Sequence, residues 1–237
     1  MCDLPGKLSM AAIVLLSGGL DSAVNLKQAA DDRGVVLALT FLYGQRAAPR
    51  EQAAAAAMCQ VLGLPHRLVE LPWLAELGAS GLTSRAVEVP TVTPDDLSAD
   101  AVAGGAAAEA VWVPNRNGLF VNIAASFAES VDADTIVAGF NAEEAATFPD
   151  NSADFVCAAT RALEFSTRGR VHLTSHTQHL DKTEIVRLGR RIEAPLCHVW
   201  SCYRGGEEHC WRCESCARLR RALTAAGEWE WFLRAHR

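Results

Sequence analysis

The chain has 237 residues, of which 50% are hydrophobic and 21% are charged, as in a globular protein that buries a sizeable core. Its 22 basic and 28 acidic side chains give a net charge of −6, which argues against a general binder of nucleic acids or membrane surfaces. No apolar run approaches the roughly 18 to 20 residues that a membrane-spanning helix needs, and no secretory leader is recognisable. We therefore expect a cytoplasmic protein made of one domain, or of one domain with a small appendage.

Short apolar runs alternate with helical patterns over the first two-thirds of the chain. The apolar runs predict five strands, at 11–16, 35–41, 66–71, 135–138 and 171–175. Helical patterns predict helices at 21–32, 51–62, 118–131 and 154–165. A further helix should begin at Asp181, which is spaced from Glu184 as an N-cap is from its N3 acid. This alternation predicts an α/β fold with a doubly wound, parallel five-stranded sheet and a ligand at the carboxyl ends of its strands.

Two segments depart from the alternation. Residues 78–110 are rich in Gly, Ala, Thr, Asp and Pro with little periodicity, which predicts a long loop or lid. From Cys197 onward the composition changes, and four of the six tryptophans lie between Trp200 and Trp231. We expect residues 10–196 to form the α/β domain and residues 197–237 to form a small C-terminal module.

The loop after the first predicted strand has a composition suited to anion binding. It reads Ser17-Gly18-Gly19-Leu20-Asp21-Ser22. Its glycines let backbone N–H groups approach an anion, its hydroxyls add donors, and the following helix contributes the partial positive charge of its N-terminus. Asp21 is either an N-cap or a Mg²⁺ ligand that bridges to phosphate. A plain glycine turn is the alternative, but the full hexapeptide after an apolar strand resembles the signature of the PP-loop ATP pyrophosphatases, which cleave ATP to AMP and pyrophosphate.

Five of the eight cysteines are crowded into the segment from Cys197 to Cys216. Four of them supply thiolates with the spacing x7, x2 and x2, namely Cys202, Cys210, Cys213 and Cys216. Four thiolates suit a closed, tetrahedral structural Zn²⁺ site, which would explain how so small a module folds.

Other interpretations of the cysteine cluster stay open from spacing alone. An iron–sulfur cluster matches part of the pattern, but the fourth cysteine at x3 and the proline after it are absent. Cys197, His198 or His209 is an alternative to one of the four ligands, and a site without metal is a further alternative. Cys197 is expected to be a spare, buried thiol.

Four strings follow one another along nearly the whole chain. They are SGGLDS at 17–22, FLYGQR at 41–46, VPNRNGLFVNIAASFAE at 113–129 and WSCYRGGEEHCWRCESCARLRRAL at 200–223. In this order they resemble the 7-cyano-7-deazaguanine synthase (QueC) family. Members convert 7-carboxy-7-deazaguanine, ammonia and ATP into the 7-nitrile on the pathway to queuosine. The resemblance implies a carbon–nitrogen ligase that adenylates a carboxylate, forms an amide with ammonia, and dehydrates that amide with a second ATP.

The resemblance also assigns residues to roles. Those that would hold ATP are Leu16, Ser17, Gly18, Gly19, Leu20, Asp21, Ser22, Ala23, Val24, Asn25 and Leu26. Those that would act in catalysis are Asp21, Arg116 and Lys182, where the two cations would bind a carboxylate or neutralise phosphate. Those that would face the substrate are Tyr43, Gln45, Arg46, Asn117, Asn141, Glu144, Phe148 and Asp150. The implied cofactors are one structural Zn²⁺ on the four cysteines named above and Mg²⁺ near Asp21, with ATP as a substrate. The alternative for Arg116 is a surface arginine at a helix cap. The alternative for Lys182 is an exposed lysine on a helix face.

The segment 139–152 departs from the pattern of the family. It keeps Gly139, Asn141, Pro149 and Asp150 but replaces most other positions. We expect Phe148 to stack on a purine-like ring and Asp150 or Glu144 to accept from its N–H edge.

This departure keeps two alternatives open. One is a related enzyme that stops at the amide or joins the activated deazaguanine to another amine. The other is a zinc-bearing module that binds nucleic acid through Arg218, Arg220 and Arg221, although the acidic balance of the chain weighs against it. The expected partners are otherwise small molecules, with neither a membrane nor a nucleic acid, and a homodimer is the candidate assembly.

Overall fold

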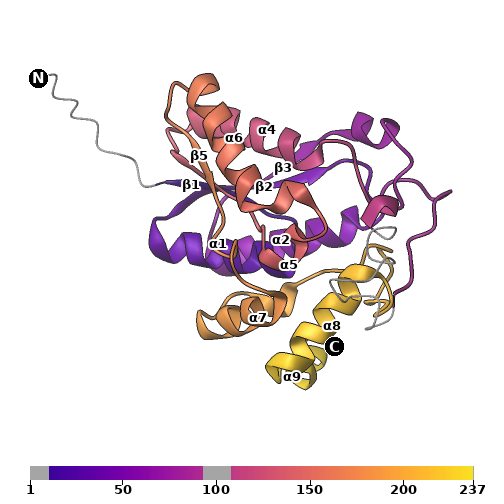
Figure 1. Ribbon diagram of the computed structural model, residues 1–237. Helices are drawn as coiled ribbons and strands as arrows, with labels where there is room; N and C mark the ends of the chain where they lie inside the picture. The colour runs from indigo at the N-terminus through magenta and orange to yellow at the C-terminus, as the bar shows by residue number, and fades with distance from the viewer. Residues whose placement is uncertain (1–10, 93–107, 237) are drawn as a thin grey trace, which may run out of the picture.

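A parallel sheet forms the centre of the computed structural model, which describes residues 11–92 and 108–236 (Figure 1). Its strands are β1 (Ala12–Leu15), β2 (Val35–Leu42), β3 (His66–Glu70), β4 (Thr135–Val137) and β5 (His172–Thr174). Their order in the sheet is β3-β2-β1-β4-β5, and every neighbouring pair is parallel. The chain winds from β1 to β3 and then returns to the other side of β1, so the predicted doubly wound sheet is confirmed. The winding reverses between β1 and β4, where open α/β sheets bind their ligands.

Helices cover both faces of this sheet (Figure 1). The longer ones are α1 (Leu20–Asp32), α2 (Ala48–Leu62), α4 (Arg116–Ser130), α6 (Ala153–Ser166), α7 (Lys182–Arg191), α8 (Glu214–Ala226) and α9 (Trp229–Ala235). Shorter ones are η1 (Pro72–Glu76), α5 (Ala142–Ala145), η3 (Pro149–Asn151) and η4 (Leu196–His198). Helices α4 and α6 lie on one face, and α1, α2, α7, α8 and α9 lie on the other. Helix α2 begins three residues before its predicted start because Pro49 is compatible with the first helical turn.

Alternate residues of β1 enter different cores. Ala12 and Val14 pack with α1 and α7, whereas Ile13 packs with α4 and α6. All three side chains are completely buried. Successive side chains of a strand point to opposite faces, so a strand covered on both faces reads as a continuous apolar run.

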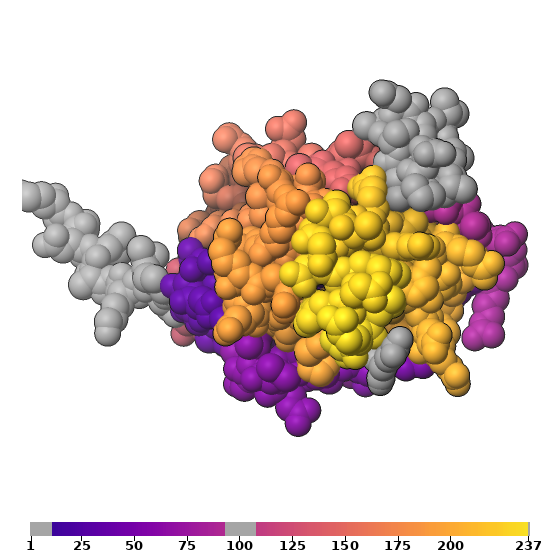
Figure 2. All heavy atoms as spheres, turned by 90° about the horizontal axis from the view of Figure 1, so that it is seen from below, coloured from indigo at the N-terminus to yellow at the C-terminus, as the bar shows by residue number. Residues whose placement is uncertain are grey.

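The C-terminal tail shares the core of the sheet domain. Leu219, Leu223 and Phe232 of α8 and α9 belong to the same buried cluster as Leu26 of α1 and Ile185 of α7. Figure 2 shows the tail lying against the segment that contains α7. The boundary that we predicted after residue 196 is therefore not marked by a gap in the hydrophobic core.

The predicted long loop at 78–110 is partly described. Residues 93–107 lie outside the described residues, 78–92 form turns, and 108–110 are helical. The backbone N–H of Val92 donates to the carbonyl of Arg212 over 2.9 Å, and Arg204 donates to the carbonyl of Val89 over 2.9 Å. The described part of this segment is thus bonded to the tail.

The structure also bears on the expected burial of Cys197 and on membrane-spanning helices. Cys197 is exposed, so the prediction of a buried thiol is wrong; it lies on the short turn η4, where neighbouring Leu196 takes the buried position. Within 11–92 and 108–236, no helix has the length and apolar character needed to cross a membrane.

Candidate active site and metal site

The glycine loop leads from the end of β1 into α1. Gly18 has a φ of +80°, and a Cβ added there would lie 2.9 Å from both the Cβ of Ala54 and the carbonyl oxygen of Glu51. Only glycine fits this backbone conformation at this closeness. The N-cap of α1 is Gly19, so Asp21 is not the cap, and no side chain covers the first N–H groups of the helix. Amide groups at a helix N-terminus form a site for an anion such as phosphate.

Three charged side chains meet beside this loop. The ammonium group of Lys182 lies 2.5 Å from a carboxylate oxygen of Asp21 and 2.6 Å from one of Glu144. Asp181 and Glu184 form a reciprocal capping box, which fixes the start of α7 and therefore the position of Lys182. Lys182 lies far from Asp21 in the sequence, but the fold brings these two predicted catalytic residues into contact.

Burial and charge set the protonation of these groups. Burial raises the pKa of Asp21 to about 6, although the charge of Lys182 opposes this rise. Burial acts in the same direction on Glu144, but Lys182 outweighs it and holds the pKa of Glu144 below its usual value. The other carboxylate oxygen of Asp21, Oδ1, is buried and has no hydrogen-bond partner among the described residues. A free, buried carboxylate oxygen beside an anion loop fits a Mg²⁺ ligand.

A cavity opens over the loop at the carboxyl ends of β1, β2 and β4. Its lining combines residues of the sheet domain with residues of the tail. From the sheet domain come Leu16, Ser17, Gly19, Asp21, Ser22, Tyr43, Gln45, Glu51, Arg116, Asn117, Phe120, Glu144, Phe148, Asn151 and Lys182, among others. From the tail come Trp200, Ser201, Tyr203, Ser215, Arg218 and Leu219.

Several residues predicted to bind ATP point away from this cavity. Ala23, Val24 and Leu26 are buried in the core between α1 and the sheet. Asn25 donates to the hydroxyl of Thr177 over 2.7 Å and so joins α1 to the segment after β5. These positions support the loop through packing and hydrogen bonding.

The residues after β2 divide into two groups. Tyr43 lines the cavity, and its hydroxyl accepts a hydrogen bond from Arg116 over 3.3 Å. Gln45 also lies at the cavity, but its amide is used internally, because it binds the backbone of Tyr43 and donates to the Glu51 carboxylate over 2.9 Å. Arg46 is absent from the lining, since its guanidinium donates to backbone carbonyls of the 78–92 segment.

Of the predicted substrate-binding residues in and near the segment from β4 to α6, some line the cavity and others do not. Phe148 lines the cavity, whereas Asn141 is buried and accepts from the N–H of Glu144 over 2.8 Å as the N-cap of α5. Asn117 lines the cavity and donates to the backbone carbonyl of Asp150 over 3.4 Å. Asp150 is not among the residues that line the cavity; its carboxylate accepts from the Asn151 amide over 3.2 Å, and burial raises its pKa while the charge of Arg116 opposes the rise.

The tail supplies a wall of the site that the sequence did not reveal. The backbone N–H of Trp200 donates to the carbonyl of Gly18 over 2.8 Å, which attaches the tail directly to the glycine loop. Gly205 packs so closely on Arg46 that an added Cβ would lie 2.3 Å from its carbonyl oxygen. The motif WSCYR was visible in the sequence, but its proximity to the loop depends on contacts with residues nearly two hundred positions earlier.

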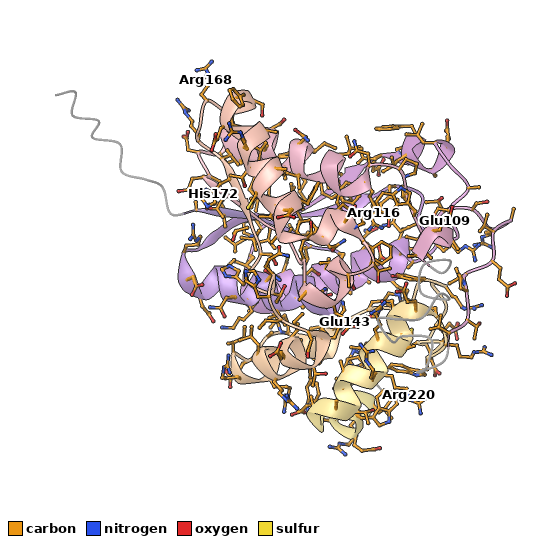
Figure 3. The ribbon with its side chains drawn as sticks, viewed as in Figure 1. Glu109, Arg116, Glu143, Arg168, His172 and Arg220 are labelled. Atoms are coloured by element: carbon orange, nitrogen blue, oxygen red, sulfur yellow. The ribbon has the colours of Figure 1, made fainter. Side chains whose placement is uncertain are left out.

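A cluster of ion pairs joins α8 to α5 at the cavity. Arg218, only 6% exposed, donates to Glu143 over 2.6 Å and to Glu214 over 2.8 Å. Arg221 pairs with the same oxygen of Glu143, which lies where the sheet domain meets the tail (Figure 3). Arg220 lies over the ring of Trp229 at 5.4 Å. The three arginines therefore do not form a free basic face, and the nucleic-acid-binding alternative is not favoured.

The four predicted cysteine ligands converge at the start of α8. The sulfur atoms of Cys202, Cys210, Cys213 and Cys216 all lie within 4.8 Å of one another, and none is in a disulfide. Backbone N–H groups of Arg212 and Cys213 point at the sulfur of Cys210, over 3.5 and 3.2 Å. Donors of this kind stabilise a thiolate, so the donor set fits a tetrahedral ion with four sulfur ligands.

Fold and site together define a class of protein. The chain is a parallel, doubly wound α/β protein with a glycine loop at the switch point, where a helix N-terminus is open to an anion, and with a four-cysteine cluster in its tail that is compatible with a metal ion. The family model described as "Queuosine biosynthesis protein QueC" matches residues 11–227, which is most of the chain. The chain belongs to this family.

Curated relatives match over nearly their whole length. A 7-cyano-7-deazaguanine synthase of Desulforamulus reducens is 51% identical over 218 residues, which cover 92% of this chain and 95% of the relative. The protein with the same name from Pelotomaculum thermopropionicum is also 51% identical over 218 residues, with 92% and 98% covered. One from Methanosarcina barkeri is 49% identical over 220 residues, which cover 92% of this chain and 95% of the relative.

Proposed function

We propose that this chain converts 7-carboxy-7-deazaguanine, ammonia and ATP into 7-cyano-7-deazaguanine, as a carbon–nitrogen ligase in the formation of a queuosine precursor. The observation that carries the proposal is the convergence of Asp21 and Lys182 beside an anion-binding loop in a member of this family. A carboxylate oxygen attacks the α-phosphorus of ATP, and pyrophosphate leaves. Ammonia then displaces AMP to give the amide. A second ATP adenylates the amide oxygen, and loss of AMP and a proton leaves the nitrile.

Each charged residue of the site has a task in these steps. The N-terminal amides of α1 hold the phosphates, and Lys182 offsets negative charge that develops as pyrophosphate leaves. Asp21 would hold Mg²⁺ through its free Oδ1, and that ion would neutralise further phosphate charge. Because binding holds the carboxylate against the α-phosphorus, the reaction needs positioning and charge neutralisation and no covalent enzyme intermediate.

The other side of the cavity suits the organic acid. Arg116 is half-buried at the cavity and donates to the Tyr43 hydroxyl, so it is positioned to bind the carboxylate of the substrate. Phe148 offers a face for a purine-like ring, and Asp150 beside it offers an acceptor for the N–H edge. We assign Asp150, and not Glu144, as this acceptor, because the Glu144 carboxylate is already paired with Lys182.

We assign a structural Zn²⁺ to Cys202, Cys210, Cys213 and Cys216, because the site holds four sulfurs and leaves no position for a substrate. The free cysteines of the cluster favour a cytoplasmic location, where thiols stay reduced.

The test supplies purified protein with the deazaguanine acid, ammonium, Mg²⁺ and ATP, and measures pyrophosphate release and product mass. We expect two pyrophosphates per acid and the mass of the nitrile. A product that stops at the amide, or that carries another amine, would establish the related activity instead. If no deazapurine acid releases pyrophosphate, the proposal is refuted. Asp150→Ala should weaken binding of the acid and leave ATP binding intact, and normal turnover of this variant would remove Asp150 from the site.

A further inference from the structure

The ammonia of the proposed reaction needs its own binding group in the cavity, because ammonia carries an extra proton at neutral pH. As ammonium it has no free electron pair, so a base must remove one proton before the nitrogen can attack. Lys182 and Arg116 line the cavity as cations and would repel it. A carboxylate that is not already paired with a cation is the group expected to bind ammonium.

Glu51 is the cavity-lining carboxylate that fits this requirement. The other acidic side chains of the lining, Asp21 and Glu144, are both paired with Lys182. Glu51 forms no ion pair with any residue that the structure describes. It is half-buried, and its Oε2 accepts from the Gln45 amide over 2.9 Å. Its Oε1 has no hydrogen-bond partner in the described part of the chain, so this oxygen is available to a ligand.

Gln45 holds the Glu51 carboxylate in place. Gln45 is 5% exposed, its Oε1 accepts from the N–H of Tyr43 over 2.8 Å, and its Nε2 donates to the carbonyl of Phe41 over 2.9 Å. These bonds fix which end of the amide meets Glu51, so the carboxylate receives an N–H donor. A hydrogen bond to one oxygen orients the carboxylate and leaves the other oxygen free to accept.

Glu51 also lies where the activated acid would form. Its backbone carbonyl packs against the glycine loop, since a Cβ added to Gly18 would lie 2.9 Å from that oxygen. Its carboxylate interacts electrostatically with Arg116, and both groups act on Tyr43. The loop is assigned to the phosphates of ATP and Arg116 to the carboxylate of the acid, so Glu51 adjoins both halves of the acyl adenylate.

The surroundings of Glu51 make it a stronger base than an exposed carboxylate. Burial raises the pKa of Glu51, while the Gln45 hydrogen bond and the charge of Arg116 oppose the rise. Tyr43 and Arg116 are the titratable and charged groups that act on it from other segments. A higher pKa favours transfer of a proton from a bound cation to the carboxylate.

We propose that Glu51 binds ammonium and accepts its proton, which frees ammonia beside the acyl adenylate. This proposal rests on the proposed function, since both reactants belong to that reaction. An N–H bond of ammonium breaks, and the proton moves to the Glu51 carboxylate. The nitrogen lone pair then forms the C–N bond, and the C–O bond to AMP breaks with its electron pair on the departing phosphate. The nitrogen gives its extra proton to water, Glu51 returns its own to solvent, and the neutral amide remains.

The test replaces Glu51 by glutamine. Glu51→Gln keeps an oxygen for the Gln45 amide, but it neither attracts a cation nor accepts a proton. Its kcat/KM for ammonium should fall about a hundredfold or more. The first step, measured without ammonium as acid-dependent exchange of labelled pyrophosphate into ATP, should be unchanged. Glu51→Asp keeps the carboxylate and should use ammonium better than Glu51→Gln does.

The control addresses the position of Glu51 in the first turn of α2, where negative charge stabilises a helix. Asp154→Asn removes an exposed acid from the first turn of α6, outside the cavity. It should use ammonium as the unaltered chain does. An equal loss in Asp154→Asn would attribute the effect to helix stability and overturn the role of Glu51.

Hydroxylamine supplies a readout that a merely structural role would not move. It is an uncharged nucleophile at neutral pH, so its attack needs no prior loss of a proton. Glu51→Gln should therefore form the hydroxamate at nearly the rate of the unaltered chain, although it uses ammonium poorly.

Three results would overturn the role of Glu51. They are an unchanged kcat/KM for ammonium in Glu51→Gln, an equal fall in hydroxamate formation or pyrophosphate exchange, and poorer use of ammonium by Glu51→Asp than by Glu51→Gln. An unaltered chain that shows no exchange with the acid would instead refute the proposed function, so the two failures are distinguished.

Discussion

The glycine loop and the tail wall enclose one cavity, but they are built in different ways. The loop is a single hexapeptide, and its shape follows from local requirements such as the positive φ of Gly18. The wall that carries Trp200 and Tyr203 depends on the cysteine cluster, on α8, and on one hydrogen bond back to the loop. Local requirements can be read from a short string, whereas a wall assembled across the whole chain cannot. Substitutions in the loop should therefore reduce activity, whereas substitutions in the tail should reduce metal binding and stability as well.

The largest effect is expected from Gly18→Val, on the loop side. The new side chain meets Ala54 and the Glu51 carbonyl and distorts the anion site, so kcat/KM should fall by roughly a thousandfold. Gly63→Val is the matched control, because Gly63 also has a positive φ, +65°, but open space around it. The control should lose some stability and keep its activity. Equal loss of activity in both variants would show that general backbone strain, and not the loop, is responsible.

Cys213→Ser tests the tail side. The sulfur of Cys213 is buried, so its loss should abolish metal binding and lower the free energy of unfolding by several kcal/mol. Metal content by atomic absorption and thermal unfolding would measure both. Cys157→Ser, at an exposed thiol, is the control. We also expect weaker nucleotide binding, because Trp200 covers the loop; full nucleotide affinity in a metal-free tail would show that the two regions are independent.

Arg218→Met probes the junction of the two regions. Its loss leaves Glu214 buried without its partner and leaves Glu143 paired with Arg221 alone, so the chain should lose about 3 kcal/mol of stability. Denaturant unfolding gives this number. The double variant Arg218→Met with Glu214→Leu should regain part of it, since the uncompensated charge is then removed. A single variant as stable as the unaltered chain would mean that the junction contributes nothing.

The smallest expected effect is the pH dependence of Mg²⁺ binding at the glycine loop. Burial raises the pKa of Asp21 to about 6, so the carboxyl is ionised above this pH and protonated below it. Protons then compete with Mg²⁺, and the affinity for Mg²⁺ should fall about tenfold for each pH unit below 6. Calorimetry of Mg²⁺ with nucleotide between pH 5 and 8 measures this. In Asp21→Asn the affinity should be low at every pH, and a similar slope in that variant would assign the titration to another group.

Sequence reasoning was most successful where structure is local. The apolar strands, the glycine loop and the capping box of Asp181 and Glu184 were predicted and are present. The spacing of the cysteines also predicted a common site, and the fold brings their sulfurs together. Each of these features is specified within about fifteen residues.

Sequence reasoning was less informative where side chains meet over long distances. The sequence around Gln45 does not show that its amide binds Glu51. The sequence around Arg46 does not show that its guanidinium binds backbone carbonyls of residues 78–92. Glu51 was missed as a cavity residue because it looks like an ordinary helix-surface acid. The tail helices α8 and α9 were not placed, because their apolar faces are explained only by the core of the sheet domain.

The hydrogen bond from Trp200 to Gly18 has a consequence for the order of events in the cell. The ribosome makes the glycine loop of residues 17–22 long before it makes Trp200, which packs over that loop. A nascent chain that has not yet reached Trp200 would carry the glycine loop without this wall of the cavity. The cavity is therefore complete only after Trp200 has been synthesised and has bonded to Gly18.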